Sequence, residues 1–273
     1  DGTIREAGER LKERWISEGW FSVATFQEPG WRIEGKKTLG LELAEPAEPG
    51  GAWSLPDVVV YPTGGGTGVL GMWKAWSELE CLGLIGPDRP RMVCVQSEAT
   101  APLVRAFEQG LADTAPAAAG KTLAYGLNVP GGVGHFRVLG IIRESGGSAI
   151  AVTEAEMESE LSAVWRDKGW WICPEGAACL AALPALRDRG MIAGGDRVVV
   201  AAHGGYASGR KQLIENGAEI YELRPDAVSG TVKEKSLFIG GKSKAALHTK
   251  AIVFDRESVF VGSYNLDPRA AEI

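Results

Sequence analysis

The sequence predicts an α/β protein in which a parallel sheet carries helices on both faces. Short apolar runs typical of buried strands alternate with longer runs of helical periodicity. The strand runs are apolar at consecutive positions, as in strands that are covered on both sides. The chain has 273 residues, 45% of them hydrophobic and 23% charged, which suffices for one large or two small domains. In such sheets, ligands bind at the carboxyl ends of the strands.

The first half of the chain supplies the start of this alternation. Apolar residues at helical spacing over 3–18 predict an opening helix, and KKTLGLELAE predicts a second one. DVVVYP, residues 57–62, predicts a buried strand that stops at its proline. Helical spacing over 69–82 then predicts a helix, and RMVCVQS, residues 91–97, predicts the next strand.

The same pattern repeats downstream. A helix is predicted over about 101–110, a strand at SAIAVT and a helix from Glu154. WWICPEGAACLAALPALRDRG predicts a strand end that leads into a helix, and DRVVVAA predicts another strand. This order of elements indicates a parallel sheet.

A change in composition near residue 200 predicts a boundary between 1–200 and 201–273. The last 73 residues carry ten Lys and Arg against nine Asp and Glu, a net charge of +1, which leaves −7 for residues 1–200. All nine tryptophans precede residue 200. The segment after Val200 predicts a helix and a strand, and ALHTKAIVFDRESVFVGSYN predicts two β-runs joined by a polar turn at Asp255 to Ser258.

Composition also restricts the classes of function. A net charge of −6 and a pI near 5.3 argue against a protein that binds nucleic acid through phosphate contacts. The four cysteines, Cys81, Cys94, Cys173 and Cys179, lack metal-ligand spacing, so they are expected to be buried free thiols, with no metal site. Apolar runs are too short to span a membrane and the N-terminus is too charged for a signal peptide, so a cytoplasmic location is expected.

Residues 63–68, Thr63-Gly64-Gly65-Gly66-Thr67-Gly68, form a glycine loop between a predicted strand and a predicted helix. Bare backbone N–H groups at a helix N-terminus bind anions, most often phosphate. A nucleotide P-loop is disfavoured because no lysine closes the loop. Gly66 to Gly71 also satisfies GxGxxG, with Glu98 placed to meet a ribose, so a dinucleotide site stays open, as does a tightly packed turn without a ligand.

A second motif lies near the C-terminus. His248, Lys250 and Asp255 satisfy HxKxxxxD, and Asn265 follows in VGSYNLDP. On a strand, residues two apart share a face, so an imidazole nucleophile is expected beside a phosphate-binding ammonium, with Asp255 on the opposite face at the strand end. The other two histidines, His135 and His203, are expected to be structural.

The segments around the glycine loop, from RIEGKKTLGLELAE through CPEGAACLAALPALRDRGMI, resemble threonine synthase and its relatives among the fold type II pyridoxal-phosphate enzymes. The resemblance implies the cofactor pyridoxal 5′-phosphate, bound by Thr63, Gly64, Gly65, Gly66, Thr67 and Gly68, with a phosphate cup at residues 64–68. It also implies that Glu175 lies near the cofactor ring. The family's Schiff-base lysine belongs to a preceding domain, so it is expected to be absent here, where only Lys12, Lys36 and Lys37 precede the loop.

Residues 203–273 resemble the phospholipase D superfamily, in particular the second half-motif of cardiolipin synthase-like members. The resemblance implies that His248 attacks a phosphodiester while Lys250 and Asn265 hold the phosphoryl oxygens. These enzymes build one site from two such motifs, whereas this sequence contains one.

Three functions remain open from the sequence. In the first, the chain joins a threonine synthase-like region to a phospholipase D-like half-site, and each is incomplete. In the second, it is a homodimeric phosphodiesterase that uses His248 and Lys250. In the third, it is an inactive truncated or spliced chain. A dehydrogenase is the least favoured alternative. The expected partners are a small phosphorylated ligand or a phosphodiester, with a homodimer left open and, through the C-terminal segment only, a membrane lipid.

Overall fold

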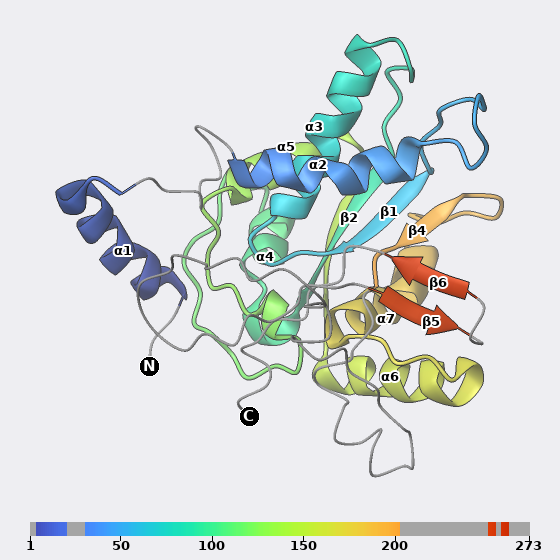
Figure 1. The fold of residues 1–273 in the computed structure, drawn as a ribbon. Coiled ribbons are helices and arrows are strands. Elements are labelled where there is room, and N and C mark those ends of the chain that lie inside the picture. Colours follow the sequence, from blue (N-terminus) through green and yellow to red (C-terminus); the bar gives the residue numbers. More distant parts are fainter. Residues whose placement is uncertain (1–3, 21–30, 203–250, 255–257, 262–273) are drawn as a thin grey trace, which may run out of the picture.

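A four-stranded parallel sheet forms the centre of the protein, in the order β3-β2-β1-β4 (Figure 1). The computed structural model of the chain describes residues 4–20, 31–202, 251–254 and 258–261. The strands are β1 (Val58–Pro62), β2 (Arg91–Ser97), β3 (Ser148–Val152) and β4 (Val198–Val200). Val58 pairs with Arg91 on one side and with Val198 on the other, and Val93 pairs with Ser148. The predicted parallel sheet and each of its four strands are confirmed. The strand end predicted at WWIC is wrong, because Ile172 forms only an isolated bridge there.

Alternate residues of the strands supply two separate hydrophobic cores. Val59 and Met92 face one core, whereas Val58, Val60 and Val93 face the other. Successive side chains of a strand point to opposite faces, so an uninterrupted apolar run fills both cores at once. This explains why the strand segments read as runs of valine rather than as alternating patterns.

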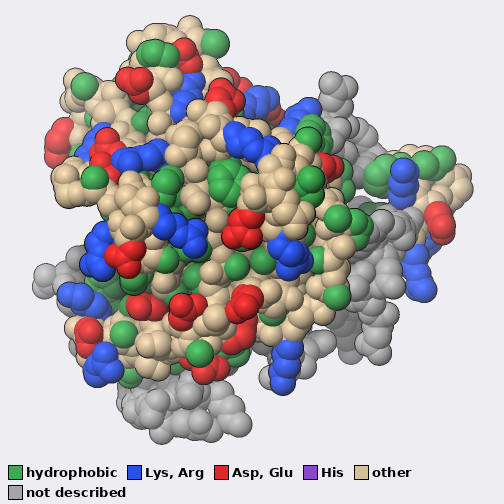
Figure 2. Space-filling view, turned by 180° about the vertical axis from the view of Figure 1, so that it is seen from behind, with side chains coloured by type: hydrophobic (Ala, Val, Ile, Leu, Met, Phe, Trp, Pro, Cys, Tyr) green, Lys and Arg blue, Asp and Glu red, His purple; other side chains and the backbone are tan. Residues whose placement is uncertain are grey.

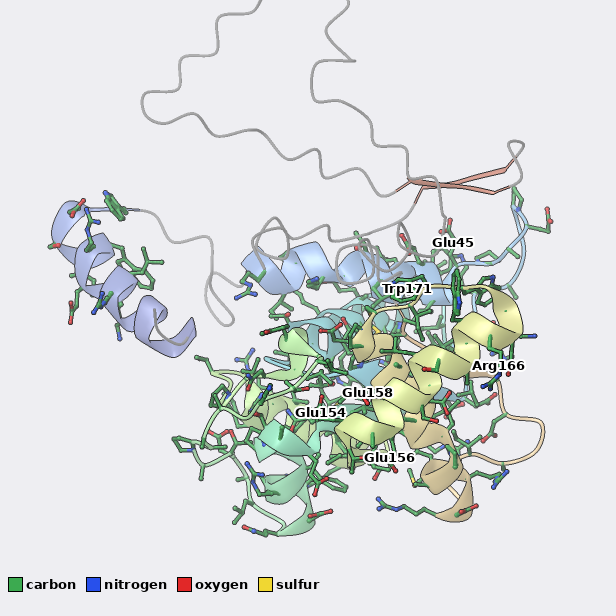
Figure 3. The ribbon with its side chains drawn as sticks, turned by 90° about the horizontal axis from the view of Figure 1, so that it is seen from below. Glu45, Glu154, Glu156, Glu158, Arg166 and Trp171 are labelled. Atoms are coloured by element: carbon green, nitrogen blue, oxygen red, sulfur yellow. The ribbon has the colours of Figure 1, made fainter. Side chains whose placement is uncertain are left out.

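Helices cover both faces of the sheet, as predicted (Figure 1). The helices of the described residues are α1 (Ile4–Glu18), α2 (Trp31–Ala44), α3 (Thr67–Cys81), α4 (Pro102–Glu108), α5 (His135–Glu144), α6 (Glu154–Lys168) and α7 (Pro174–Asp188), with short 3₁₀ turns η1 (Glu98–Thr100) and η2 (Tyr125–Leu127). Residues of α2, α3, α4 and α5 fill the core on one face, and α6 and α7 fill the other. Helix α1 lies apart from the sheet in both ribbon views (Figures 1 and 3).

Two helices differ from the sequence prediction. Helix α5 was not predicted, although Val138, Leu139, Ile141 and Ile142 give it a buried face at helical spacing. Helix α2 begins at Trp31, several residues before the predicted KKTLGLELAE segment, because the buried Ile33 extends its apolar face toward the N-terminus.

Helix α6 begins with a capping box. The hydroxyl of Thr153 accepts a hydrogen bond from the Glu156 backbone N–H, and the Glu156 carboxylate accepts one from the Thr153 N–H. Glu154 and Glu156 lie at the start of α6 and Arg166 lies near its end, which complements the helix dipole (Figure 3). Gly169 ends the helix in the left-handed conformation, with φ 67°.

The described C-terminal residues form a hairpin. β5 (Ala251–Phe254) and β6 (Ser258–Val261) pair antiparallel, with Ala251 opposite Val261. This confirms the two predicted β-runs, while the connecting residues 255–257 lie outside the described part of the chain.

The four cysteines are free thiols, but not all are buried. Cys94 and Cys179 are buried and Cys173 is half-buried, whereas Cys81 is exposed, which corrects the sequence prediction. Cys81 is the last residue of α3, where the helix leaves the core. In the described ranges, no group of three or more His, Cys, Asp and Glu side chains is arranged to hold a metal ion.

The charge distribution on the surface and the hydrophobicity of the helices can be compared with the expected partners. The face seen in Figure 2 shows basic and acidic side chains interspersed rather than a continuous basic stripe. None of the helices within the described segments combines the length and hydrophobicity needed to cross a membrane.

Candidate functional site

The glycine loop starts where β1 ends, at the carboxyl edge of the sheet. Thr63 continues the sheet by donating its N–H to the Val95 carbonyl at 2.8 Å, and its hydroxyl donates to the Tyr61 carbonyl at 3.0 Å. The fully buried Gln96 donates its amide to the Thr63 carbonyl at 2.9 Å and accepts the Leu103 N–H at 2.9 Å. Gln96 thereby ties the start of the loop to the first turn of α4.

The loop ends at a helix N-terminus that has no side-chain cap. Gly66 is the N-cap residue of α3, with φ 86° and no side-chain hydrogen bond to the first turn. The first N–H groups of a helix have no partner within the helix, and the helix dipole adds partial positive charge there. Thr67 and Gly68, which open α3, therefore present backbone donors suited to an anion.

Close packing explains three of the four glycines. A side chain at Gly64 would overlap the Gly126 carbonyl, one at Gly66 would overlap the Val138 side chain, and one at Gly68 would overlap the Tyr61 hydroxyl. Gly66 also needs its positive φ, which L-residues with a side chain adopt only at a cost. A tightly packed turn, one of the alternatives from the sequence, is thus present, with the Val138 and Tyr61 side chains packed against Gly66 and Gly68.

Glu175 is connected to the glycine loop through one residue, Gly126. Its carboxylate accepts the Gly126 N–H at 2.8 Å, and the Gly126 carbonyl lies against Gly64. Glu175 itself stands in the first turn of α7, next to the N-cap Cys173. The predicted position of Glu175 beside a cofactor ring stays a prediction, but the structure places it two contacts from the loop.

The side chain of His135 contacts the glycine loop. The sequence analysis expected this histidine to be structural and did not assign it to the site. The ring is fully buried, and its Nε2 lies 2.8 Å from the Gly64 carbonyl oxygen. On the other side, Nδ1 lies 3.1 Å from the Gly132 backbone nitrogen and 3.0 Å from the Thr114 hydroxyl. Burial lowers the pKa of His135, so its imidazole is neutral near pH 7. The available sequence signal was a histidine at the start of an amphipathic run.

Three buried weak acids near the loop, the Tyr61 phenol and the Cys94 and Cys179 thiols, are neutral as well. Burial raises the pKa of the Tyr61 phenol to about 12 and that of the Cys94 thiol to about 12. The pKa of Cys179 is likewise raised well above its usual value, chiefly by burial. These three groups therefore stay protonated near pH 7.

The remaining predicted site residues separate into two groups. Glu98, proposed for a ribose, lies exposed in η1 directly after β2. His248, Lys250, Asp255 and Asn265 lie outside the described residues, as does His203.

A hollow of about 530 Å³ lies on the outer side of α3, lined by Lys74, Ser77, Glu78, Cys81 and Leu82, none of which belongs to the glycine loop.

Two curated relatives match different lengths of the chain. Threonine synthase from Methanosarcina acetivorans is 30% identical over 214 residues, which cover 78% of this chain and 50% of the relative. The chain thus spans about half the length of that relative. Cardiolipin synthase C from Escherichia coli is 44% identical over 73 residues, which cover 26% of this chain and 15% of that protein.

A solved structure and a family model agree with the fold. The structure of maize serine racemase superposes with a TM-score of 0.54 over 79% of this chain and 63% of that one, at 17% identity, so it supports the fold alone. The model of the family described as pyridoxal-phosphate dependent enzymes matches residues 1–204. That match contains the sheet, the glycine loop and Glu175, and this chain belongs to the family of pyridoxal-phosphate dependent enzymes.

Proposed function

We propose that the glycine loop binds the phosphate group of pyridoxal 5′-phosphate and that residues 1–200 form a threonine synthase-like region for amino-acid lyase or synthase chemistry. The observation that carries the proposal is the uncapped N-terminus of α3 directly after a loop of small residues at the carboxyl edge of a parallel sheet. Family membership and the similarity to threonine synthase favour this cofactor over a dinucleotide.

In this proposal the backbone does most of the binding. The N–H groups of Gly65, Thr67 and Gly68 donate to the phosphate oxygens. Glu175 fixes Gly126 and so holds the opposite wall of the loop in place. When bound, pyridoxal phosphate supplies an electron sink for reactions at the α-carbon of amino acids.

We further propose that binding in this chain is non-covalent. Of the lysines that precede the loop, Lys37 pairs with Glu34 and Glu78 at 2.7 and 2.8 Å on the outer side of α2 and α3. Lys36 is exposed on α2, and Lys12 lies on α1, which stands apart from the sheet. None of the three therefore supports a covalent anchor at the loop.

The test compares pyridoxal phosphate with pyridoxal, which lacks the phosphate. We expect the phosphorylated form to bind and inorganic phosphate to compete with it. Gly66→Ala should weaken binding by about tenfold, because an alanine at positive φ costs about 1–2 kcal/mol and its methyl group would overlap the Val138 side chain, which displaces the loop. Gly140→Ala is the matched control, since Gly140 lies in α5 with open space around its Cα. Borohydride reduction should leave no stoichiometric lysine adduct. Equal affinity for pyridoxal, or a single labelled lysine, would contradict the proposal.

A second function is favoured by a different observation. The 73-residue similarity to cardiolipin synthase C equals in length the segment 201–273, which contains the HxKxxxxD motif. We propose that this segment is a separate phospholipase D-like half-domain, in which His248 is the nucleophile and Lys250 and Asn265 bind the phosphoryl oxygens. Because it contains one motif, a complete phosphodiesterase site would require two copies of the chain.

A further inference from the structure

The imidazole of His135 has hydrogen-bond partners on both ring nitrogens, and these partners fix its tautomer. The Gly132 N–H donates to Nδ1 at 3.1 Å, so Nδ1 carries a lone pair and the proton resides on Nε2. Nε2 therefore donates to the Gly64 carbonyl at 2.8 Å. The Thr114 hydroxyl, 3.0 Å from Nδ1, acts as a second donor to the same lone pair.

This hydrogen bond sets the orientation of one peptide of the glycine loop. In a planar trans peptide, the carbonyl and the N–H point in opposite directions. With the Gly64 carbonyl directed at the buried imidazole, the N–H of Gly65 is directed away from it. Gly64 is also packed against the Gly126 carbonyl and the Val129 side chain, so the peptide has little room to turn.

We propose that His135 is a positioning residue of the anion site: its Nε2–H holds the Gly64–Gly65 peptide so that the Gly65 N–H is presented to a phosphate-sized anion. The inference rests on the proposed function, because it assigns a role at the same site. His135 does not touch the anion. It acts through the peptide whose carbonyl it binds, and α5 carries it to the loop together with Val138, which packs against Gly66.

Protonation of His135 would disturb this arrangement. A proton on Nδ1 would face the Gly132 N–H, placing two donors against each other, so the imidazolium would have to move or the loop at Gly132 would have to open. The charged group that faces the ring is Asp113, beside Thr114, and its carboxylate favours the protonated form; burial opposes it and prevails. Anion binding should thus weaken on acidification.

Sulfate is a suitable probe because its charge does not change over the pH range of the test. We expect His135→Phe, which removes the donor and retains a ring, to weaken sulfate binding measured by calorimetry by about tenfold at about pH 7.5. His135→Gln, whose amide can donate to the same carbonyl, should retain most of the affinity. Thr100→Val is the control, because it breaks the Thr100–Asn128 hydrogen bond in the neighbouring loops without touching the glycine loop.

The pH dependence provides a second readout. The ratio of wild-type to His135→Gln sulfate affinity should fall as the pH drops below about 6.5 toward the lowered pKa of the buried His135, since only the wild type carries this titrating group. Wild-type affinity in His135→Phe, or a ratio that stays constant down to the pH at which the protein unfolds, overturns the inference while leaving the phosphate site intact. Failure of sulfate to bind the wild type overturns the proposed function and this inference with it.

Discussion

At the residue scale, the site is built from backbone groups whose positions are set by three polar side chains, the buried Gln96 and His135 and the half-buried Glu175. Gln96 holds the Thr63 carbonyl, His135 holds the Gly64 carbonyl and Glu175 holds the Gly126 N–H. Each of these side chains comes from a different segment of the fold. A backbone hydrogen bond to a buried side chain costs more to break than an exposed one, because the freed group has no water to replace its partner.

The first prediction concerns the acid stability of the protein. The pKa of His135 is lowered in the folded state, so below its ordinary value near 6.5 the unfolded chain binds more protons than the folded one. The contribution of His135 is therefore fully present above about pH 6.5 and is lost as the pH falls toward the folded-state pKa. Urea unfolding at about pH 7.5 and about pH 5.5 should show this loss in the wild type and a smaller one in His135→Gln. An equal loss in both proteins would show that other groups are responsible.

At the element scale, α2 and α3 pack closely enough to exclude a side chain between them. A Cβ at Gly40 would lie 2.8 Å from the Ala75 Cβ and 2.8 Å from the Met72 Cα. The buried Trp76 of α3 donates its indole N–H to the Gly40 carbonyl at 2.9 Å. The small residues where α2 crosses α3 therefore allow the large aromatic side chain of Trp76 to form a hydrogen bond with the backbone of α2.

The second prediction tests this contact within one helix. Gly40→Ala should lower the free energy of unfolding by about 1–3 kcal/mol, since the added methyl group meets backbone atoms that cannot move aside easily. Gly35→Ala, in the same helix but with open space around it, should raise the free energy of unfolding by about 0.5–1 kcal/mol through helix propensity alone. Chemical denaturation of both variants measures the two changes in the free energy of unfolding. Equal effects of Gly40→Ala and Gly35→Ala would rule out the close packing of α2 against α3 at Gly40.

The third prediction concerns the start of α6. Thr153→Ala removes the hydroxyl that accepts the Glu156 N–H, so it should lower the free energy of unfolding by about 1 kcal/mol. Thr153→Ser retains that acceptor and should stay close to the wild type. If the alanine variant were as stable as the serine variant, the capping box would not contribute.

Secondary structure could be predicted from the sequence where the spacing of the apolar residues followed a single period, either that of a helix or that of a strand. The valine-rich runs of β1, β2 and β4 and the caps around α6 specify their elements locally. Helix α5 was not assigned, because it follows a long irregular segment and opens after Gly134 rather than after a strong capping residue. That helix carries both His135 and Val138, so the support of the glycine loop was missed together with it.

The candidate site, likewise, could be predicted from the sequence only in part. The glycine loop and the start of its helix followed from glycine density between two periodic segments. The contacts that shape the loop did not, because Gly126, Glu175 and His135 are separated from Gly64 by 62, 111 and 71 positions along the chain, and periodicity carries no information about which distant residues meet. Only the resemblance to a known family had pointed to Glu175.

At the scale of the whole molecule, the two proposed sites lie on parts of the chain that differ in net charge. Residues 1–200 carry a net charge of −7 and contain the sheet and glycine loop, whereas residues 201–273 carry +1 and contain the HxKxxxxD motif. In the two proposals, both parts act on phosphate groups, residues 1–200 by binding through backbone N–H groups and residues 201–273 by attack through an imidazole. The two proposals therefore make separable predictions, since Gly66→Ala affects the first and His248→Ala the second.

The last prediction concerns phosphodiester cleavage by the whole chain. A site with one HxKxxxxD motif supplies a nucleophile but no second imidazole to protonate the leaving group, so a monomer should not turn over a phosphodiester model substrate. If two chains combine their motifs, the rate per chain should rise with protein concentration and level off when the dimer saturates. His248→Ala should abolish the rate, while His203→Ala, a histidine outside the motif, should leave it unchanged. Cleavage at a rate per chain that does not depend on concentration, or activity that survives in His248→Ala, would refute the two-copy site.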